Sequence, residues 1–292
     1  FFFQADDGIR DRSPSRGLGD VYKRQVQGLE AESYLHSQLS QNIDDMEDAE
    51  SRLSFLLEPK GNIEGFFRVT KREEGHFLLD TNAGYGASLV SSLERFKLRT
   101  KADFDLHNWT MVSVLGEDTP RDLAPEVLSV ASPWLCESYT DLLGDAVDID
   151  LPLCAEEEYE SLRFRCGLPT IGKELQVGGI PNESGLVHLA VSFDKGCYRG
   201  QELVERISAR GGGRRIIRRI CSDIALVSGQ DLFVASECVG QVLSATTAAP
   251  YVGFASVSGD ITETTTDVGG KISVVPLEKV LDLQNRSGLI GE

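Results

Sequence analysis

The sequence has no run of apolar residues long enough to cross a membrane. None of the apolar stretches in its 292 residues approaches the roughly 20 residues that a membrane helix needs. The apolar residues 1–3 are also too few for a secretory signal. With 41% hydrophobic and 26% charged residues, the composition is that of an ordinary soluble protein. We therefore expect a cytoplasmic protein that does not bind membranes.

Positive charge is scarce. The chain has 29 lysines and arginines against 46 acidic residues, which gives a net charge of −17. Such a chain repels polyanions, so we expect no direct binding to nucleic acid. Any anionic ligand must be held by a local basic feature. A cluster of arginines is one candidate, although it also fits a solvated strand and loop: Arg206, Arg210, Arg214, Arg215, Arg218 and Arg219.

Closely spaced cysteines are absent. The nearest two of the six cysteines, Cys154 and Cys166, are 12 positions apart, so there is no C-x-x-C pair. This spacing argues against a zinc knuckle or ribbon. A chain of this length with a normal core also has no need of a disulfide scaffold. We therefore expect buried free thiols at every cysteine except Cys197; the five are Cys136, Cys154, Cys166, Cys221 and Cys238.

The first 25 residues resemble translated sequencing adapter. Residues 15–25 read SRGLGDVYKRQ, and residues 4–11 read QADDGIRD. Both strings correspond to pieces of one adapter in the correct order, apart from Asp6, where the adapter would give glutamate. The alternative is a natural basic, glycine-rich arm. We predict that residues 1–25 are an artefact, disordered and outside the fold, and that a few native residues are missing at the start.

The remaining chain mixes helical and strand patterns without a regular β-α-β repeat, so the expected fold class is α+β. Apolar periodicity predicts helices and strands in the first part of the chain. The helices are expected at 31–39, 87–96, 156–166 and 202–208, and the strands at 52–57, 66–69, 77–79, 102–106, 110–115 and 189–193.

The character of the sequence changes at the glycines 211–213. Beyond them the chain is rich in β-branched residues and punctuated by glycine, which is typical of a small barrel or sandwich. The short strands are expected at 216–217, 232–234, 239–243, 252–257 and 272–275. We therefore predict a boundary near Gly213 that divides an α+β region, 26–213, from a barrel domain, 214–292.

One cysteine has a distinctive setting. Cys197 stands between Lys195 and Arg199, just before the expected start of a helix at Gln201. Nearby cations and the positive end of a helix both favour the thiolate form of a cysteine. The sequence therefore allows a nucleophilic or metal-binding sulfur at this position. A buried cysteine in a structural loop, with its neighbouring charges solvated, fits the same residues equally well.

The surrounding string is more specific than the single cysteine. Residues 195–202 read KGCYRGQE and fill every fixed position of the motif K-G-C-[F/Y]-x-G-Q-E, which is the signature of the YgfZ family. These residues are Lys195, Gly196, Cys197, Tyr198, Gly200, Gln201 and Glu202. Flanking similarity at 167–169, 181–186 and 41–44, and at Arg210 and Gly211, extends the resemblance over about 26–276.

The resemblance implies a fold like that of the glycine cleavage T-protein, in which two α+β segments and a small β-barrel surround a folate pocket. It also implies tetrahydrofolate or a derivative as the ligand. The family maintains iron–sulfur enzymes, including enzymes that modify tRNA, so client enzymes or assembly proteins are the implied partners. Cys197 would be the functional residue in assembly or repair of iron–sulfur clusters.

The chain departs from T-proteins at the pterin site. T-proteins carry a glutamate in the helix corresponding to 162–167, and this chain has Arg165 there. The reversed charge removes the acceptor for the pterin N–H groups. This argues for a maintenance factor and against the alternative, a folate-dependent aminomethyltransferase or demethylase. Substitute folate contacts are Asn42, Asp44 and Glu183, each of which also fits a turn or capping role. The arginine cluster would suit the anionic tail of folate.

Overall fold

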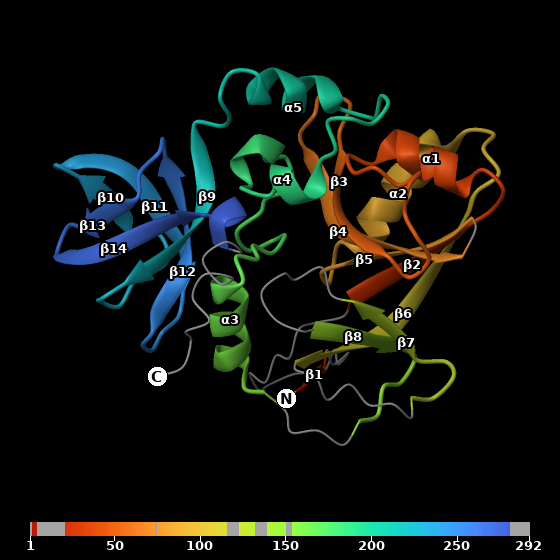
Figure 1. Ribbon diagram of the computed structural model, residues 1–292, viewed down its shortest axis with the longest axis horizontal. Coiled ribbons are helices and arrows are strands. Elements are labelled where there is room, and N and C mark those ends of the chain that lie inside the picture. The colour runs from red at the N-terminus through yellow and green to blue at the C-terminus, as the bar shows by residue number, and fades with distance from the viewer. Residues whose placement is uncertain are drawn as a thin grey trace. The chain divides into compact units, whose positions relative to one another are not determined.

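The computed structural model describes residues 2–4, 21–73, 75–115, 123–131, 139–149 and 154–280. The chain divides into two compact units (Figure 1). The sheet unit comprises 1–60, 64–156 and 189–201, and the barrel unit comprises 61–63, 157–188 and 202–292. The boundary predicted at Gly213 does not coincide with this division. Glycines mark a local break, whereas the units are defined by long-range packing that composition does not record.

The sheet unit is built on an eight-stranded sheet in its described residues. The strand order is β3-β4-β5-β2-β6-β8-β7, and β1 pairs with β6. The strands are β1 (Phe2–Gln4), β2 (Val21–Gln27), β3 (Ser51–Leu57), β4 (Ile63–Glu73), β5 (His76–Thr81), β6 (Asp103–Leu115), β7 (Leu128–Ala131) and β8 (Tyr139–Gly144).

Two helices cover one face of this sheet. Helix α1 (Ala31–Gln38) contacts β5, and helix α2 (Gly86–Lys97) contacts β2 and β6. Alternate residues of a strand point to opposite faces, so Phe67 and Phe77 join the helices in one core with Leu35. The helices predicted at 31–39 and 87–96 are therefore confirmed, and their apolar faces form this core.

The opposite face of the sheet carries a buried ion cluster. Arg68 on β4 donates two hydrogen bonds to Asp80 on β5, at 2.8 and 3.0 Å, and a third to Asp141 on β8. Ser113 on β6 also donates to Asp141, at 2.6 Å. Buried charges need such partners because unpaired ones are strongly destabilising. The cluster therefore ties four strands together.

The second strand corrects an expectation about the N-terminal residues. As part of β2, Tyr22–Gln25 pair with β5 on one side and with β6 on the other, and Val21 pairs with β6. Phe2–Gln4 also pair, at the edge of β6. The expectation of disorder for 1–25 is therefore wrong for these residues, while 5–20 lie outside the described residues. Adapter-like strings can enter a sheet because strand pairing uses backbone groups. The adapter origin stays a prediction.

The barrel unit is centred on a closed barrel of six strands, in the order β10-β11-β12-β9-β14-β13. This confirms the small barrel expected after Gly213. The strands are β9 (Arg215–Ser222), β10 (Asp231–Val234), β11 (Glu237–Ala245), β12 (Tyr251–Ser258), β13 (Glu263–Thr266) and β14 (Gly269–Pro276). Inward residues such as Ile220, Leu232 and Val257 fill its interior.

The described chain also has four short helical elements: α3 (Glu156–Arg165), the 3₁₀ turn η1 (Pro181–Glu183), α4 (Val187–Ala190) and α5 (Gln201–Ser208). Figure 1 labels α3, α4 and α5. The helices expected at 156–166 and 202–208 are confirmed. The strand expected at 189–193 is wrong: Leu189 and Ala190 end α4, and no strand includes 191–193. The strands expected at 102–106 and 110–115 are one continuous strand, β6.

A buried ion pair joins α3 to the turn that follows it. Arg163 makes two hydrogen bonds to Glu174, both at 2.9 Å, and contacts Glu160 as well. Ser244 of β11 donates to the same Glu174 carboxylate. The Glu174 side chain is 0% exposed. The barrel strand β11 is thereby tied to the helical part of its own unit.

The cysteines differ from the sequence prediction. Cys166 is buried, as expected, but it forms a disulfide and is not a free thiol. Cys154 is only half-buried, Cys221 is free and half-buried, and Cys238 is free and exposed. Cys136 lies outside the described residues. A hydrophobic sequence context cannot distinguish a buried thiol from a buried disulfide, because both are apolar.

No helix in the described part of the chain is long and apolar enough to span a membrane.

Candidate functional site

The Cys197 loop, residues 194–200, is fastened to helix α1 by Lys195. The Lys195 ammonium donates to the carbonyl oxygens of His36 at 2.5 Å, Leu39 at 2.7 Å and Gln41 at 2.9 Å. These carbonyls lie at and just beyond the C-terminus of α1, where helix carbonyls lack partners and the helix dipole is negative. One lysine therefore caps the helix and fixes the loop.

The position of Lys195 has an electrostatic consequence. Burial lowers the pKa of Lys195 to about 8, although the Asp44 carboxylate opposes the shift. The ammonium also lies 5.2 Å from the centre of the Tyr198 ring. A cation over an aromatic ring is attracted to it, so the buried Tyr198 and Lys195 hold each other in the loop.

Arg199 fastens the other side of the loop. Its guanidinium donates to Glu64 on β4 at 2.7 Å and to Ser92 on α2 at 2.9 Å, and it stacks 4.4 Å from the Phe96 ring. The Arg199 amide also donates to the carbonyl of Ser37, at 3.2 Å. Burial lowers the pKa of Arg199 below its ordinary value, while Glu64 opposes the shift.

Cys197 stands exposed between these two anchors. Its sulfur accepts a hydrogen bond from the side-chain amide of Gln201, at 3.8 Å. The other end of that amide accepts the backbone N–H of Tyr198, at 2.8 Å. Gln201 is the first residue of α5. The helix therefore begins with a side chain that reaches back to the cysteine.

This geometry corrects one part of the sequence argument. The cationic groups of Lys195 and Arg199 flank Cys197 in sequence, but both are bonded to other parts of the sheet unit. These contacts of Lys195 and Arg199 hold the loop in place. Gln201, expected only as a motif residue, is the side chain that contacts the sulfur. The turn also needs glycine at position 200, where φ is +81°.

Two folate-binding candidates lie beside the loop. The segment with Asn42 and Asp44 follows Gln41, whose carbonyl binds Lys195. Asp44 pairs with His36 at 3.0 Å. Burial, and then Lys195, lower the pKa of that histidine. The Oδ1 atom of Asn42 is buried and has no hydrogen-bond partner among the described residues.

The third candidate belongs to the barrel unit. Glu183 ends η1 and packs against Gly213, where a Cβ would lie 2.6 Å from the Glu183 Cγ. Its neighbour Asn182 donates to Ser208 at 2.7 Å and leaves its own buried Oδ1 without a partner among the described residues. The structure therefore brings Asn42 and Asp44 to the Cys197 loop within one unit, whereas Glu183 lies in the other.

The arginine cluster is divided in its roles. Arg218 is buried and donates to the carbonyl of Gly259 at 2.6 Å, and Arg219 donates to the carbonyl of Arg165 at 3.1 Å. Arg206 faces the exposed Glu202 at 3.7 Å. The exposed members are Arg206, Arg210, Arg214 and Arg215. Gly211, after Arg210, has φ of +91°, and a Cβ added there would meet nothing within 4 Å, so it forms an open turn.

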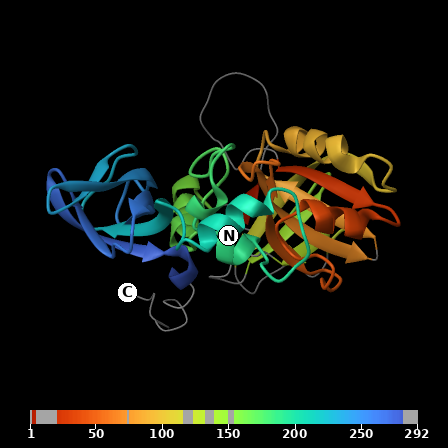
Figure 2. The same cartoon turned by 90° about the horizontal axis from the view of Figure 1, so that it is seen from above.

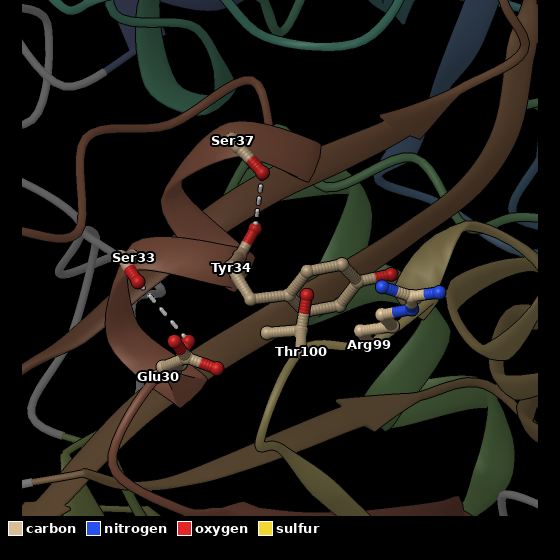
Figure 3. Close-up of a pocket in the computed structure, with 6 residues that line it drawn as sticks. All are labelled: Glu30, Ser33, Tyr34, Ser37, Arg99 and Thr100. Atoms are coloured by element: carbon tan, nitrogen blue, oxygen red, sulfur yellow. Dashed lines mark hydrogen bonds between the residues drawn. The ribbon is translucent and has the colours of Figure 1, made fainter.

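A hollow of about 430 Å³ lies on the sheet unit (Figure 3). Its lining comes from α1 and from the turn after α2: Glu30, Ser33, Tyr34, Ser37, Arg99 and Thr100. Burial raises the pKa of Tyr34 to about 12, although Arg199 opposes the shift. Ser37 links the hollow to the Cys197 loop, because its carbonyl accepts the Arg199 amide. Sequence periodicity gave no sign of this hollow.

No group of three or more metal-ligating side chains gathers within the described ranges. Among the described cysteines Cys197 and Cys238 are exposed, and the motif and the anchored loop distinguish Cys197 from Cys238.

The fold and site together define a class of protein. The structure, seen from above in Figure 2, matches the glycine cleavage system aminomethyltransferase T from Bartonella henselae with a TM-score of 0.74 at 18% identity. The match covers 88% of this chain and 85% of that one. At that identity the likeness is one of fold. The chain therefore has the glycine cleavage T-protein fold.

Sequence comparison identifies the relatives within that class. No family model matches the chain. It is 25% identical over 243 residues to the tRNA-modifying protein YgfZ of Klebsiella pneumoniae, covering 74% of each. It is 27% identical over 218 residues to the mitochondrial iron–sulfur cluster assembly factor IBA57 homolog of Neurospora crassa, covering 66% of this chain and 50% of that one. These findings confirm the predicted resemblance: the chain is a YgfZ-like protein with the T-protein fold.

Proposed function

We propose that the chain is a tetrahydrofolate-binding factor that helps assemble or repair iron–sulfur clusters in client enzymes, including enzymes that modify tRNA. Cys197 is its functional thiol. The observation that carries the proposal is the exposure of Cys197 on a loop anchored by Lys195 and Arg199 on its two sides. A merely structural cysteine would be buried and would need no such support.

The names of the relatives support the same role. One relative is a tRNA-modifying protein and another is an iron–sulfur cluster assembly factor. Both activities would be served by one protein that maintains the clusters of tRNA-modifying enzymes. Such a protein would work in the cytoplasm with those enzymes as partners. The cluster would be its cargo, held for a time by the Cys197 thiolate.

Folate binding is supported by unpaired acceptors. A reduced pterin presents amino and ring N–H donors, which need carbonyl or carboxylate oxygens. The buried Oδ1 atoms of Asn42 and Asn182 lack hydrogen-bond partners among the described residues. An unpaired buried acceptor destabilises the fold unless a ligand supplies a donor. Within the sheet unit, Asn42 would supply such an acceptor to the pterin. These residues fit the ligand.

The fold match favours a second candidate, an aminomethyltransferase or demethylase of the T-protein class. The two roles make different demands on the chain. A transferase needs an acceptor for the pterin at position 165, where this chain has arginine. Its Nε atom is buried and has no partner among the described residues. A donor at that site would repel the pterin N–H groups, so we favour the maintenance role.

Two assays separate these functions. Purified chain is incubated with a client enzyme whose cluster has been damaged, with and without tetrahydrofolate, and cluster recovery is followed by absorbance. The maintenance role predicts folate-dependent recovery that Asn42→Ala weakens. In parallel, the chain is tested for folate-dependent ammonia release from an aminomethylated carrier protein. Ammonia release without cluster recovery would overturn the proposal in favour of the transferase.

A further inference from the structure

The turn at Leu98 has a backbone conformation that leucine rarely adopts. Leu98 has φ of 50° and ψ of −111°, and the Thr100 N–H donates across it to the Lys97 carbonyl at 3.0 Å. These angles match the second residue of a type II′ turn, a position at which glycine predominates. An L side chain at this position is strained.

Leu98 is also exposed to solvent over 91% of its surface. The side chain thus adds strain without burying apolar area. Folding stability does not explain a leucine here, because glycine would fit the turn better. Sites where strain and exposure coincide are commonly functional, so a contact outside the fold is the physical explanation to test.

The surroundings of Leu98 form a surface suited to such a contact. Leu98 and the 93% exposed Leu29 immediately precede two residues that line the hollow of Figure 3, Arg99 and Glu30. We call this surface the Leu98 hollow. It combines two exposed apolar side chains with a cavity that offers hydroxyl oxygens from Ser33, Ser37 and Thr100.

The segment that carries Leu98, residues 95–101, has four basic residues and no acidic one. Arg95, Arg99 and Lys101 are exposed, and none of them forms an ion pair within the described residues. Glu30 is the one acidic residue of the lining, and its carboxylate is held by the Lys101 backbone N–H at 2.6 Å. In a chain of net charge −17, such a cluster attracts acidic partners locally.

We propose that the Leu98 hollow docks an acidic segment of a partner protein, with an apolar side chain of that segment against Leu98. The carbonyl of Ser37, which lines the hollow, accepts the amide of Arg199. A docked segment therefore lies beside the Cys197 loop. The proposal names a docking surface for the maintenance role and rests on that role only for the identity of the partner.

The test measures binding of a fluorescent peptide of about twelve residues made of glutamate, aspartate and leucine. The comparison peptide has lysine in place of each acidic residue. By fluorescence anisotropy, the acidic peptide should bind the full chain, more weakly as salt is added, and the lysine peptide should not bind. Leu98→Gly should weaken binding about five-fold and Arg99→Glu about ten-fold.

Matched variants keep the result interpretable. Val268→Gly removes another exposed apolar side chain, and Lys279→Glu reverses another exposed charge, both in the barrel unit. Both should bind the acidic peptide like the unaltered chain. Leu98→Gly should also unfold at no lower denaturant concentration than the unaltered chain, because glycine relieves the strained turn. Lost binding in that variant therefore cannot be attributed to misfolding.

Three outcomes would overturn the proposal. One is no saturable binding of the acidic peptide at millimolar concentration. Another is equal binding to the unaltered chain, Leu98→Gly and Arg99→Glu. The third is a dimer, seen by sedimentation, that Leu98→Gly dissociates, since that would assign the surface to a second copy. Peptide binding is independent of folate and of Cys197, so failure here leaves the proposed function to its own assays.

Discussion

The side-chain amide of Gln201 donates to the sulfur of Cys197 at 3.8 Å. Its oxygen simultaneously accepts the N–H of Tyr198 at 2.8 Å. One side chain at the start of α5 therefore sets both the backbone of the loop and the direction of its sulfur. Gln201, and not Lys195 or Arg199, is therefore the polar side chain that the structure places against the Cys197 sulfur.

Gln201→Leu should slow alkylation of Cys197 at neutral pH. The substitution removes one hydrogen bond to sulfur, worth about 1 kcal/mol, so the rate should fall by about five-fold. The rate is measured with iodoacetamide and mass spectrometry of the Cys197 peptide. Gln241→Leu is the matched control, since Gln241 is exposed on β11 and bonds the Gly229 carbonyl. Equal rates in the unaltered chain and Gln201→Leu would show that the contact is incidental.

Lys195 should make stability depend on pH in the alkaline range. Burial lowers its pKa in the folded chain to about 8, against about 10.4 in an unfolded chain. Between these values the unfolded state binds more protons, so stability should rise with pH. Below pH 8 the ammonium is charged in both states, and its burial cost is fully present.

The measurement compares urea unfolding of the unaltered chain and Lys195→Met at pH 7 and pH 9.5. Groups that do not interact with Lys195 titrate equally in both proteins, and the ordinary histidine pKa of about 6.5, which applies to His36, lies below both pH values, so the difference between the proteins reports on Lys195. The unaltered chain should gain stability relative to Lys195→Met as the pH rises. A difference that stays constant, or that moves the other way, would mean that the carbonyls of α1 keep the pKa of Lys195 near its ordinary value.

Glu174 and Glu160 both bind Arg163 but should differ in what they contribute. The Glu174 side chain is fully buried, whereas Glu160 is partly exposed. Removing one partner of a buried pair costs about 3–5 kcal/mol, while an exposed pair is worth about 1 kcal/mol or less. Glu174→Gln should therefore destabilise the chain by several times more than Glu160→Gln in urea unfolding. Equal effects would mean that water reaches the pair.

Deletion of residues 1–25 should destabilise the chain, although the sequence alone predicted no effect. The deletion removes Val21, which pairs with β6, and Tyr22–Gln25, which pair with both β5 and β6. Deletion of residues 1–20 is the matched control, because it leaves β2 whole. Thermal unfolding should show a drop of several degrees for the longer deletion relative to the shorter one. Equal melting temperatures would support the disordered arm that the adapter-like sequence suggested.

The sequence predicts best where local pattern and packing agree. Helices α1 and α2 have apolar residues at helical spacing that enter one core, so both were found close to their observed bounds. Five of the six barrel strands are predicted because β-branched residues alternate with glycine-containing turns, whereas β13 is not predicted. Strand β2 is not predicted because most of it lies in the adapter-like string, and β8 is not predicted because its sequence, YTDLLG, has only one β-branched residue.

The candidate site was found by its motif and explained only by the fold. KGCYRGQE identifies the loop, but nothing local shows that Lys195 reaches the end of α1 or that Arg199 reaches Glu64. Such contacts join residues more than one hundred positions apart in the chain. The strained turn at Leu98 was likewise invisible, because backbone angles of a leucine cannot be read from its neighbours.

The most direct test of the account is rescue by Cys197→Ser in bacterial cells that lack YgfZ. Serine keeps the size and polarity of the side chain but cannot supply a thiolate, so the variant should fold normally and fail to restore the activity of iron–sulfur, tRNA-modifying enzymes. Cys238→Ser, which changes another exposed free thiol, should rescue fully. Full rescue by Cys197→Ser would contradict the account, because the thiol of the anchored loop would then not be needed.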